Sequence, residues 1–141
     1  MVLDRAGIEA VIPHRDPFVL IDSVEAMRPG HTVSATKYVD PAEAYFKGHF
    51  PGNPVMPGVM IVEAIAQAGA VCMLSTPEFS GCTAYFAGID KVRFKRKVAP
   101  GDTLTIHVEI GRMRGRIGFG HGKAFVGDEL ACQADILFAI G

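Results

Sequence analysis

Two side chains of this sequence have the chemistry for proton transfer, and they lie close together in the chain. His49 belongs to a stretch crowded with proline and glycine, GHFPGNPVMPG at 48–58, and Glu63 belongs to the apolar run that follows it. An imidazole titrates near neutral pH, and a carboxyl group among apolar residues must lose its charge or find a partner. One such group can remove a proton while the other delivers one, which suits chemistry beside a carbonyl group.

Two neighbouring residues fit the same chemistry. Gln67 lies one helical turn beyond Glu63 and shares its face, so it can support the carboxyl group. Gly58 stands at the expected start of a helix, where a backbone N–H without a blocking side chain can bind a polarised carbonyl oxygen. A structural role stays open for His49, because a histidine beside an aromatic residue is often structural. Glu63 is harder to explain in that way, because an unpaired buried charge is costly.

The apolar run predicts a buried helix from Val59 to Leu74. Nearly every residue in it is apolar or small, and a helix that is apolar on all sides is normally buried. Pro57 suits the first helical position, since its fixed φ fits the helix and its missing N–H would have no helical partner. The run is too short, and too acidic at its centre, for a good membrane span. We therefore expect a central core helix that carries a carboxylate.

The rest of the chain predicts strands around this helix. Asp4 is typical of a helix N-cap, which predicts one short helix at 4–11. Gly88 predicts a bend in a long strand, and the glycines of 111–122 predict a sharply bent part of the sheet rather than a phosphate-binding loop. Alternating apolar residues predict separate strands at 18–27, 31–39, 83–98, 104–110 and 130–140.

Length and composition limit the possible class of protein. The chain has 141 residues and a formal net charge of −1, which predicts one domain over 1–141 and no general attraction to nucleic acid. Its three cysteines are odd in number and lack the spacing of metal ligands, so reduced thiols are expected. No basic segment followed by an apolar one marks a signal peptide. The sequence therefore predicts a cytoplasmic protein without membrane insertion.

The string GHFPGNPVMPGVMIVEAIAQ, which contains His49, Gly58, Glu63 and Gln67, resembles the signature of the 3-hydroxyacyl-acyl-carrier-protein dehydratases of fatty-acid synthesis, the Z type. Three further stretches resemble the same family, so the match covers nearly the whole chain: IPHRDPFVLID at 12–22, GIDKVRFKRKVAPGDTL at 88–104, and the glycine-rich region after Arg112. Asp16 and Gln133 depart from the family pattern.

The resemblance implies an α+β hot-dog fold, in which a long central helix is wrapped by one curved antiparallel sheet of about six strands. It also implies an oligomer. The expected catalytic unit is a homodimer in which His49 of one subunit faces Glu63 of the other, and a trimer of dimers is the expected assembly.

The implied reaction removes water from a (3R)-hydroxyacyl thioester and gives a trans-2-enoyl thioester. His49 is the expected base. Glu63 acts on the hydroxyl side, either as a protonated acid or by orienting water, with support from Gln67. The Gly58 N–H holds the thioester oxygen. The expected substrate-binding residues are Gly58, Gln67, Phe50 and Val59. No metal or organic cofactor is expected, and the substrate arrives on the phosphopantetheine arm of acyl carrier protein.

Several interpretations stay open at this point. The basic side chains at 91–97 suit either a charged edge strand that resists aggregation or a dock for acidic acyl carrier protein. His14 and Arg15 suit either an exposed polar corner or a site for an anionic partner. For the whole protein, the alternatives are a hot-dog acyl thioesterase and a non-catalytic scaffold that binds the acyl carrier.

Overall fold

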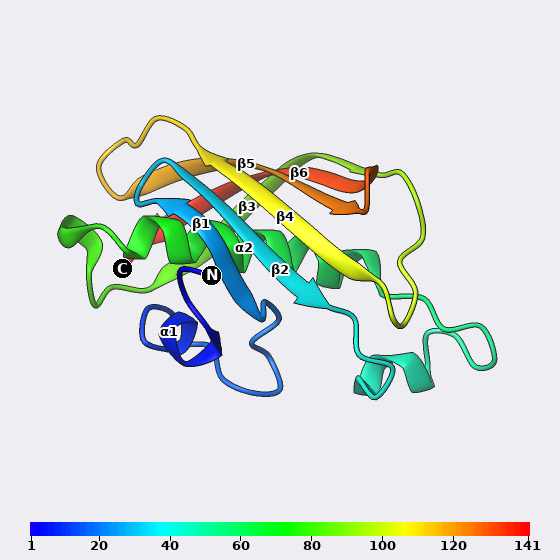
Figure 1. The fold of residues 1–141 in the computed structure, drawn as a ribbon. Helices are drawn as coiled ribbons and strands as arrows, with labels where there is room; N and C mark the ends of the chain where they lie inside the picture. Colours follow the sequence, from blue (N-terminus) through cyan, green and yellow to red (C-terminus); the bar gives the residue numbers. More distant parts are fainter.

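One long helix lies along the concave face of a curved antiparallel sheet (Figure 1). The computed structural model describes residues 1–141. The long helix is α2, Gly58–Leu74, and the six strands follow the order β1-β2-β4-β5-β6-β3 across the sheet. The strands are β1 Ser23–Arg28, β2 Thr32–Tyr38, β3 Ala84–Phe94, β4 Thr103–Ile110, β5 Ile117–Val126 and β6 Glu129–Ile140. Three short helical segments complete the chain: α1 Arg5–Glu9, η1 Ala44–Lys47 and η2 Pro77–Phe79. This is the hot-dog fold, as predicted.

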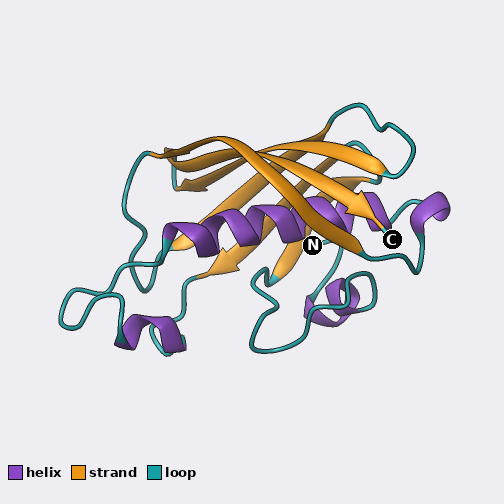
Figure 2. Cartoon of the chain, turned by 180° about the vertical axis from the view of Figure 1, so that it is seen from behind, coloured by secondary structure: helices purple, strands orange, loops and turns teal.

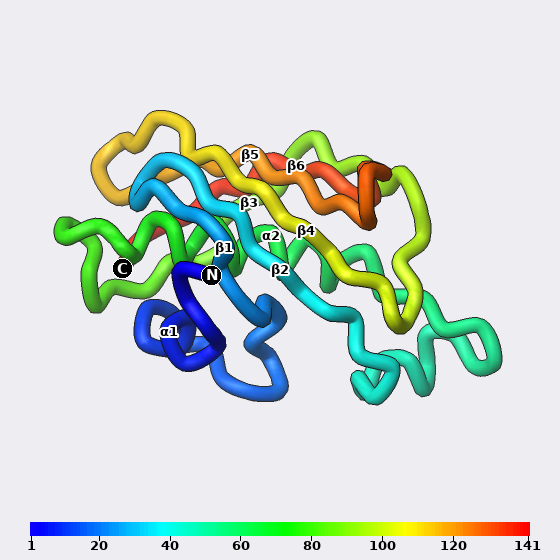
Figure 3. The backbone as a smooth tube through the Cα atoms, in the orientation of Figure 1, coloured from blue at the N-terminus to red at the C-terminus, as the bar shows by residue number.

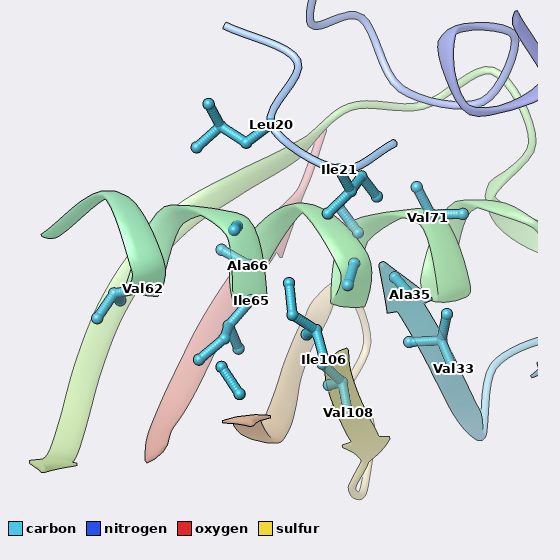
Figure 4. Packing of buried hydrophobic residues seen from close by; sticks show 14 of the residues in the cluster. Leu20, Ile21, Val33, Ala35, Val62, Ile65, Ala66, Val71, Ile106 and Val108 are labelled. Carbon is cyan, nitrogen blue, oxygen red and sulfur yellow. The ribbon is translucent and has the colours of Figure 1, made fainter. Parts of the chain in front are cut away.

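The helix α2 forms the centre of the core, and every residue from Ala64 to Leu74 is buried. On one side it contacts apolar residues of the sheet such as Ile106 and Val108, and on the other it is covered by the segment that carries Leu20 and Ile21 (Figure 4). Burying a large apolar side chain contributes about 1.5–3 kcal/mol. The view from behind shows how the sheet curves over the helix (Figure 2). No helix has the length and apolar character needed to cross a bilayer.

The start of α2 differs by one residue from the prediction. Pro57 is the N-cap rather than the first helical residue, because its ψ of 135° is extended. Its fixed φ of −58° serves either position equally well. The Pro57 carbonyl accepts hydrogen bonds from the N–H groups of Met60 and Ile61, so the helix proper begins at Gly58.

The N-terminal segment confirms one prediction and corrects another. Asp4 caps α1 as predicted, since its carboxylate accepts the N–H of Gly7 at 2.8 Å. The first strand, however, begins at Ser23 and not at Phe18. Residues 18–22 precede β1 and cross the buried helix, where the Phe18 carbonyl and the Leu20 N–H hydrogen-bond to a helix side chain. The Asp22 N–H already bonds to the Thr36 carbonyl of β2.

The strand β3 lies at one edge of the sheet and pairs only with β6. Its register shifts between Phe86 and Gly88, which agrees with the predicted bend. The strand ends at Phe94, short of the predicted end at Val98, and residues 95–102 form a loop. The loop at 48–57 projects beyond the same end of the sheet (Figures 1 and 3).

The glycines of β5 lie where the sheet packs closely on α2. β5 is a continuous strand, and its pairing with β4 has no register shift. A Cβ at Gly122 would lie 2.2 Å from Ile65 Cγ2, and one at Gly118 would lie 2.6 Å from Met73 Cε. These glycines therefore let α2 approach the sheet closely.

Candidate active site

Glu63 is held in place by a buried amide one turn further along α2. The Gln67 side chain is 1% exposed, and its Nε2 donates to Glu63 Oε2 at 3.0 Å and to the Phe18 carbonyl at 2.8 Å. Its Oε1 accepts the N–H of Leu20 at 2.8 Å. Both donors of the amide are therefore in use, which fixes the Glu63 carboxylate beside the segment at 18–20. Gln67 was predicted to bind substrate, and in the structure both of its amide N–H groups donate to the protein, one of them to Glu63.

A second imidazole lies next to this carboxylate. His14 Nε2 is 3.8 Å from Glu63 Oε2, and the two side chains are 24% and 20% exposed. Together with Gln67 they line a small cavity of about 50 Å³ whose remaining walls are apolar: Ala66, Ala70, Ala84, Phe86 and Phe138. The sequence left His14 either in an exposed polar corner or in a site for an anionic partner, and did not place it beside Glu63. The signal that could have found it is its place in the IPHRDPFVLID stretch, which also supplies the backbone that Gln67 binds.

His49 is held by backbone groups of its own loop. Its Nδ1 lies 2.9 Å from the Val55 carbonyl oxygen, and its own carbonyl accepts the Val55 N–H at 2.9 Å. A carbonyl can only accept, so Nδ1 carries the proton and Nε2 of the neutral ring keeps a free lone pair. The imidazole also stacks on Phe50, with ring centroids 4.1 Å apart. This arrangement leaves Nε2 as a potential proton acceptor.

The start of α2 offers two unpaired donors beside His49. The N–H groups of Gly58 and Val59 have no hydrogen-bond partner in the chain. His49, Gly58 and Val59 line one cleft of about 490 Å³, together with the loop residues Lys95, Arg96 and Lys97. The Phe94 ring packs on Gly58, where an added Cβ would lie 2.6 Å from Phe94 Cε1. A carbonyl oxygen in this cleft would meet backbone donors reinforced by the helix dipole.

The two predicted catalytic side chains do not meet within one chain. The cleft that contains His49 and the cavity that contains Glu63 share no lining residue. Of the other predicted residues, Val59 lines the His49 cleft and is 74% exposed, and Phe50 is 51% exposed. The structure therefore presents two separate half-sites.

Known proteins match this chain over nearly its whole length. A model of the FabA-like domain matches residues 12–135. A relative from Moorella thermoacetica named 3-hydroxyacyl-[acyl-carrier-protein] dehydratase FabZ is 52% identical over 139 residues, which cover 99% of this chain and 97% of the relative. A protein of the same name from Enterococcus faecalis is 52% identical over 141 residues. The match covers 100% of this chain and 100% of that protein.

Solved structures support the fold. The dehydratase heterocomplex ApeI:P from Xenorhabdus doucetiae superposes with a TM-score of 0.81 at 16% identity, over 95% of this chain and 90% of that chain. A thioesterase mutant from Pseudomonas aeruginosa gives a TM-score of 0.73 at 14% identity, over 99% and 95% of the two chains. At such low identity these structures are evidence for the fold alone. The family match and the full-length relatives carry the conclusion that this chain belongs to the FabA-like domain family.

Proposed function

We propose that this protein dehydrates (3R)-hydroxyacyl-[acyl-carrier-protein] to trans-2-enoyl-[acyl-carrier-protein] in fatty-acid biosynthesis or a related acyl pathway. The observation that carries the proposal is the state of His49, whose Nδ1 is committed to the Val55 carbonyl and whose Nε2 is free to accept a proton. The relatives that match over the whole chain bear the name of this dehydratase.

The proposed chemistry is an elimination that needs one base and one acid. His49 Nε2 removes a proton from the carbon next to the thioester carbonyl, and the electron pair of that C–H bond forms the new double bond. The C–O bond to the hydroxyl group breaks, and protonated Glu63 gives its proton to the departing oxygen, so that water leaves. Imidazolium and carboxylate remain, and one proton returns through solvent. Proton transfer alone suffices for this reaction.

Negative charge develops on the thioester oxygen as the proton is removed. The Gly58 N–H is unpaired at the positive end of the α2 dipole and faces the same cleft as His49. A hydrogen bond there strengthens as the charge grows, which lowers the barrier. The exposed side chains of Phe50 and Val59 give apolar contacts beside this point. On the Glu63 side, the walls of the small cavity are apolar, which suits contact with carbons of the acyl chain close to the hydroxyl group.

Because the half-sites are separate, we propose that a second copy of the chain completes the site. The edge strand β3 supports this, because its unpaired edge carries exposed apolar side chains: Tyr85 at 60%, Phe86 at 38%, Ile89 at 53% and Phe94 at 55% exposure. Joining two such edges would bury this surface and continue the sheet through the dimer. In that dimer His49 of one subunit faces Glu63 of its partner. A trimer of dimers remains the expected larger assembly.

The partner that delivers the substrate is proposed to be acyl carrier protein, which docks beside the His49 cleft. Lys95 and Lys97 are exposed at the mouth of that cleft, and neither side chain has an acidic partner. Arg96, in contrast, is paired with Asp102 and Glu129. We place the reaction in the cytoplasm, in line with three cysteines that are all free thiols.

The test is incubation of the protein with carrier-bound (3R)-hydroxyacyl groups from C4 to C16, followed by mass spectrometry of the intact carriers. Loss of one water from the carrier-bound acyl group is the expected result. Release of free carrier thiol would instead identify the thioesterase alternative. Tight binding without turnover for any chain length would identify the non-catalytic scaffold.

A further inference from the structure

A lysine occupies a core-facing position in β2. Residues at alternate positions of this strand, Val33, Ala35 and Lys37, are buried beneath the sheet. The Lys37 side chain is only 4% exposed. A buried ammonium group is costly unless it is paired, so this position calls for an explanation beyond core packing.

The partner of this lysine is an acidic residue just before the catalytic loop. Lys37 Nζ lies 2.7 Å from Glu43 Oε1, and Glu43 is the N-cap residue of η1. The second carboxylate oxygen of Glu43 and the Tyr45 hydroxyl are both buried without another hydrogen-bond partner. Burial, together with the nearby Glu43 carboxylate, raises the pKa of Tyr45 well above its ordinary value. Lys37, Glu43 and Tyr45 therefore form one buried polar cluster.

This cluster is connected to the proposed base through the backbone. The carbonyl oxygen of Tyr45 accepts the N–H of His49 at 3.1 Å and the N–H of Gly48 at 3.3 Å. The same residues line a cavity of about 680 Å³ that also contains Met60, from the first turn of α2. The ion pair thus links a rigid strand to the segment from which His49 projects.

We propose that the Lys37–Glu43 ion pair is a positioning device for His49. By holding Glu43, Lys37 fixes η1 and Tyr45. The Tyr45 carbonyl, which accepts the His49 N–H, then fixes the position of the His49 backbone relative to the cleft. The assignment of His49 as base rests on the proposed function. The chain of contacts from the Lys37–Glu43 ion pair to the His49 N–H does not depend on it. A displacement near 1 Å at a catalytic group can cost on the order of 100-fold in rate, so a link of this kind has a measurable effect.

The first experiment measures hydrogen exchange of the His49 amide by NMR and needs no enzymatic activity. Lys37→Met removes the ammonium group and keeps the aliphatic stem. The double variant Lys37→Met/Glu43→Gln also leaves no unpaired charge, so it serves if the single variant does not fold. We expect the His49 amide to exchange at least about tenfold faster in either variant, while amides of β5 and β6 keep their protection. Unchanged exchange at His49, or an equal loss of protection throughout the sheet, would overturn the proposal.

The second experiment uses mixed dimers to separate positioning from a general structural defect. The first mixed dimer pairs one chain that carries the double variant with one chain that carries Glu63→Gln. Its one complete site combines the His49 of the Glu63→Gln chain with the Glu63 of the double-variant chain. The second mixed dimer pairs a double-variant chain with a His49→Ala chain, so its one complete site must use the His49 of the double-variant chain. We expect near wild-type kcat per complete site in the first mixture and at least about tenfold lower kcat, with little change in KM, in the second. Equal loss in both mixtures would show a merely structural role.

Two controls keep the interpretation separate from that of the proposed function. Arg5→Met breaks the Arg5–Asp22 ion pair on the N-terminal side of the same cavity, so it should change neither His49 exchange nor kcat. If Arg5→Met speeds His49 exchange as much as the Lys37 variants do, the specific link is wrong. If the wild-type protein has no dehydratase activity, the proposed function fails while the exchange experiment still decides the link.

Discussion

The two half-sites of the molecule are built in different ways. Glu63 lies in the middle of a buried helix, and a side-chain amide that is itself 1% exposed locks its carboxylate in place. His49 lies in an exposed loop, and its ring is held by one backbone carbonyl. The position of Glu63 therefore depends on the core of the fold, and the position of His49 depends on a solvent-exposed loop. In the proposed mechanism, the acid is therefore held in place by its own chain, and the base stands in a loop that a second chain would have to approach.

The largest effect is expected from removing either catalytic group. His49→Ala and Glu63→Gln should each lower kcat at least about 100-fold, because each removes one partner of the proton transfer. Both variants should stay folded and dimeric, as judged by circular dichroism and sedimentation. Turnover within tenfold of the wild type in either variant would contradict the assignment of that residue.

Mixing these two inactive variants then tests whether the half-sites come from different chains. Each mixed dimer has one site with a normal His49 and a normal Glu63, so about half of its sites should recover. The measurement is dehydration activity after subunit exchange, with the mixed species quantified by native mass spectrometry. Mixed dimers that form but remain inactive would place both groups of a site on one chain.

The next largest effect is expected at the β3 edge, which we propose joins two subunits. Ile89→Lys introduces a charge into the exposed apolar surface of β3, which should shift the protein toward monomer and lower activity with it. Phe119→Lys is a matched control, because Phe119 lies within β5 and is 50% exposed, close to the 53% of Ile89. Sedimentation velocity over a range of concentrations should show a weaker dimer for Ile89→Lys only. Equal effects of the two substitutions would exclude β3 as the specific interface.

A moderate effect is expected from Gln67→Met, which keeps the volume of the side chain and removes its three hydrogen bonds. The Leu20 N–H and the Phe18 carbonyl lose their partner, so the free energy of unfolding should fall by about 1–3 kcal/mol. Glu63 also loses its anchor, and kcat should fall about tenfold while KM changes little. Urea unfolding and steady-state kinetics measure the two effects. A loss of stability without any change in kcat would reduce Gln67 to a structural residue.

The same contrast explains how far the sequence could be interpreted. The helix, its burial and the carboxylate within it were predictable, because an apolar run with few polar interruptions specifies a core helix almost by itself. The course of residues 18–22 was not, since their apolar run fits a strand and only the folded chain shows that Gln67 binds the Phe18 carbonyl and the Leu20 N–H. The buried Lys37 escaped notice for a similar reason: lysine is normally exposed, and its partner Glu43 belongs to a different element.

The smallest effect is expected for docking of the carrier. Lys95→Glu/Lys97→Glu reverses two charges at the mouth of the His49 cleft and should raise KM for a carrier-bound substrate several-fold. Exposed charges steer an acidic partner without contacting the reacting atoms, so kcat and the KM of a short pantetheine thioester should hardly change. Arg112→Glu/Arg114→Glu makes the same change in net charge in the β4–β5 loop, outside the His49 cleft, which separates local docking from a general charge effect.

Added salt should raise the wild-type KM for the carrier substrate as well, because exposed charge pairs are screened over about 8–10 Å near physiological ionic strength. If both double variants raise this KM equally, the attraction is a property of the whole surface, and the basic side chains at 91–97 serve chiefly to protect the sheet edge.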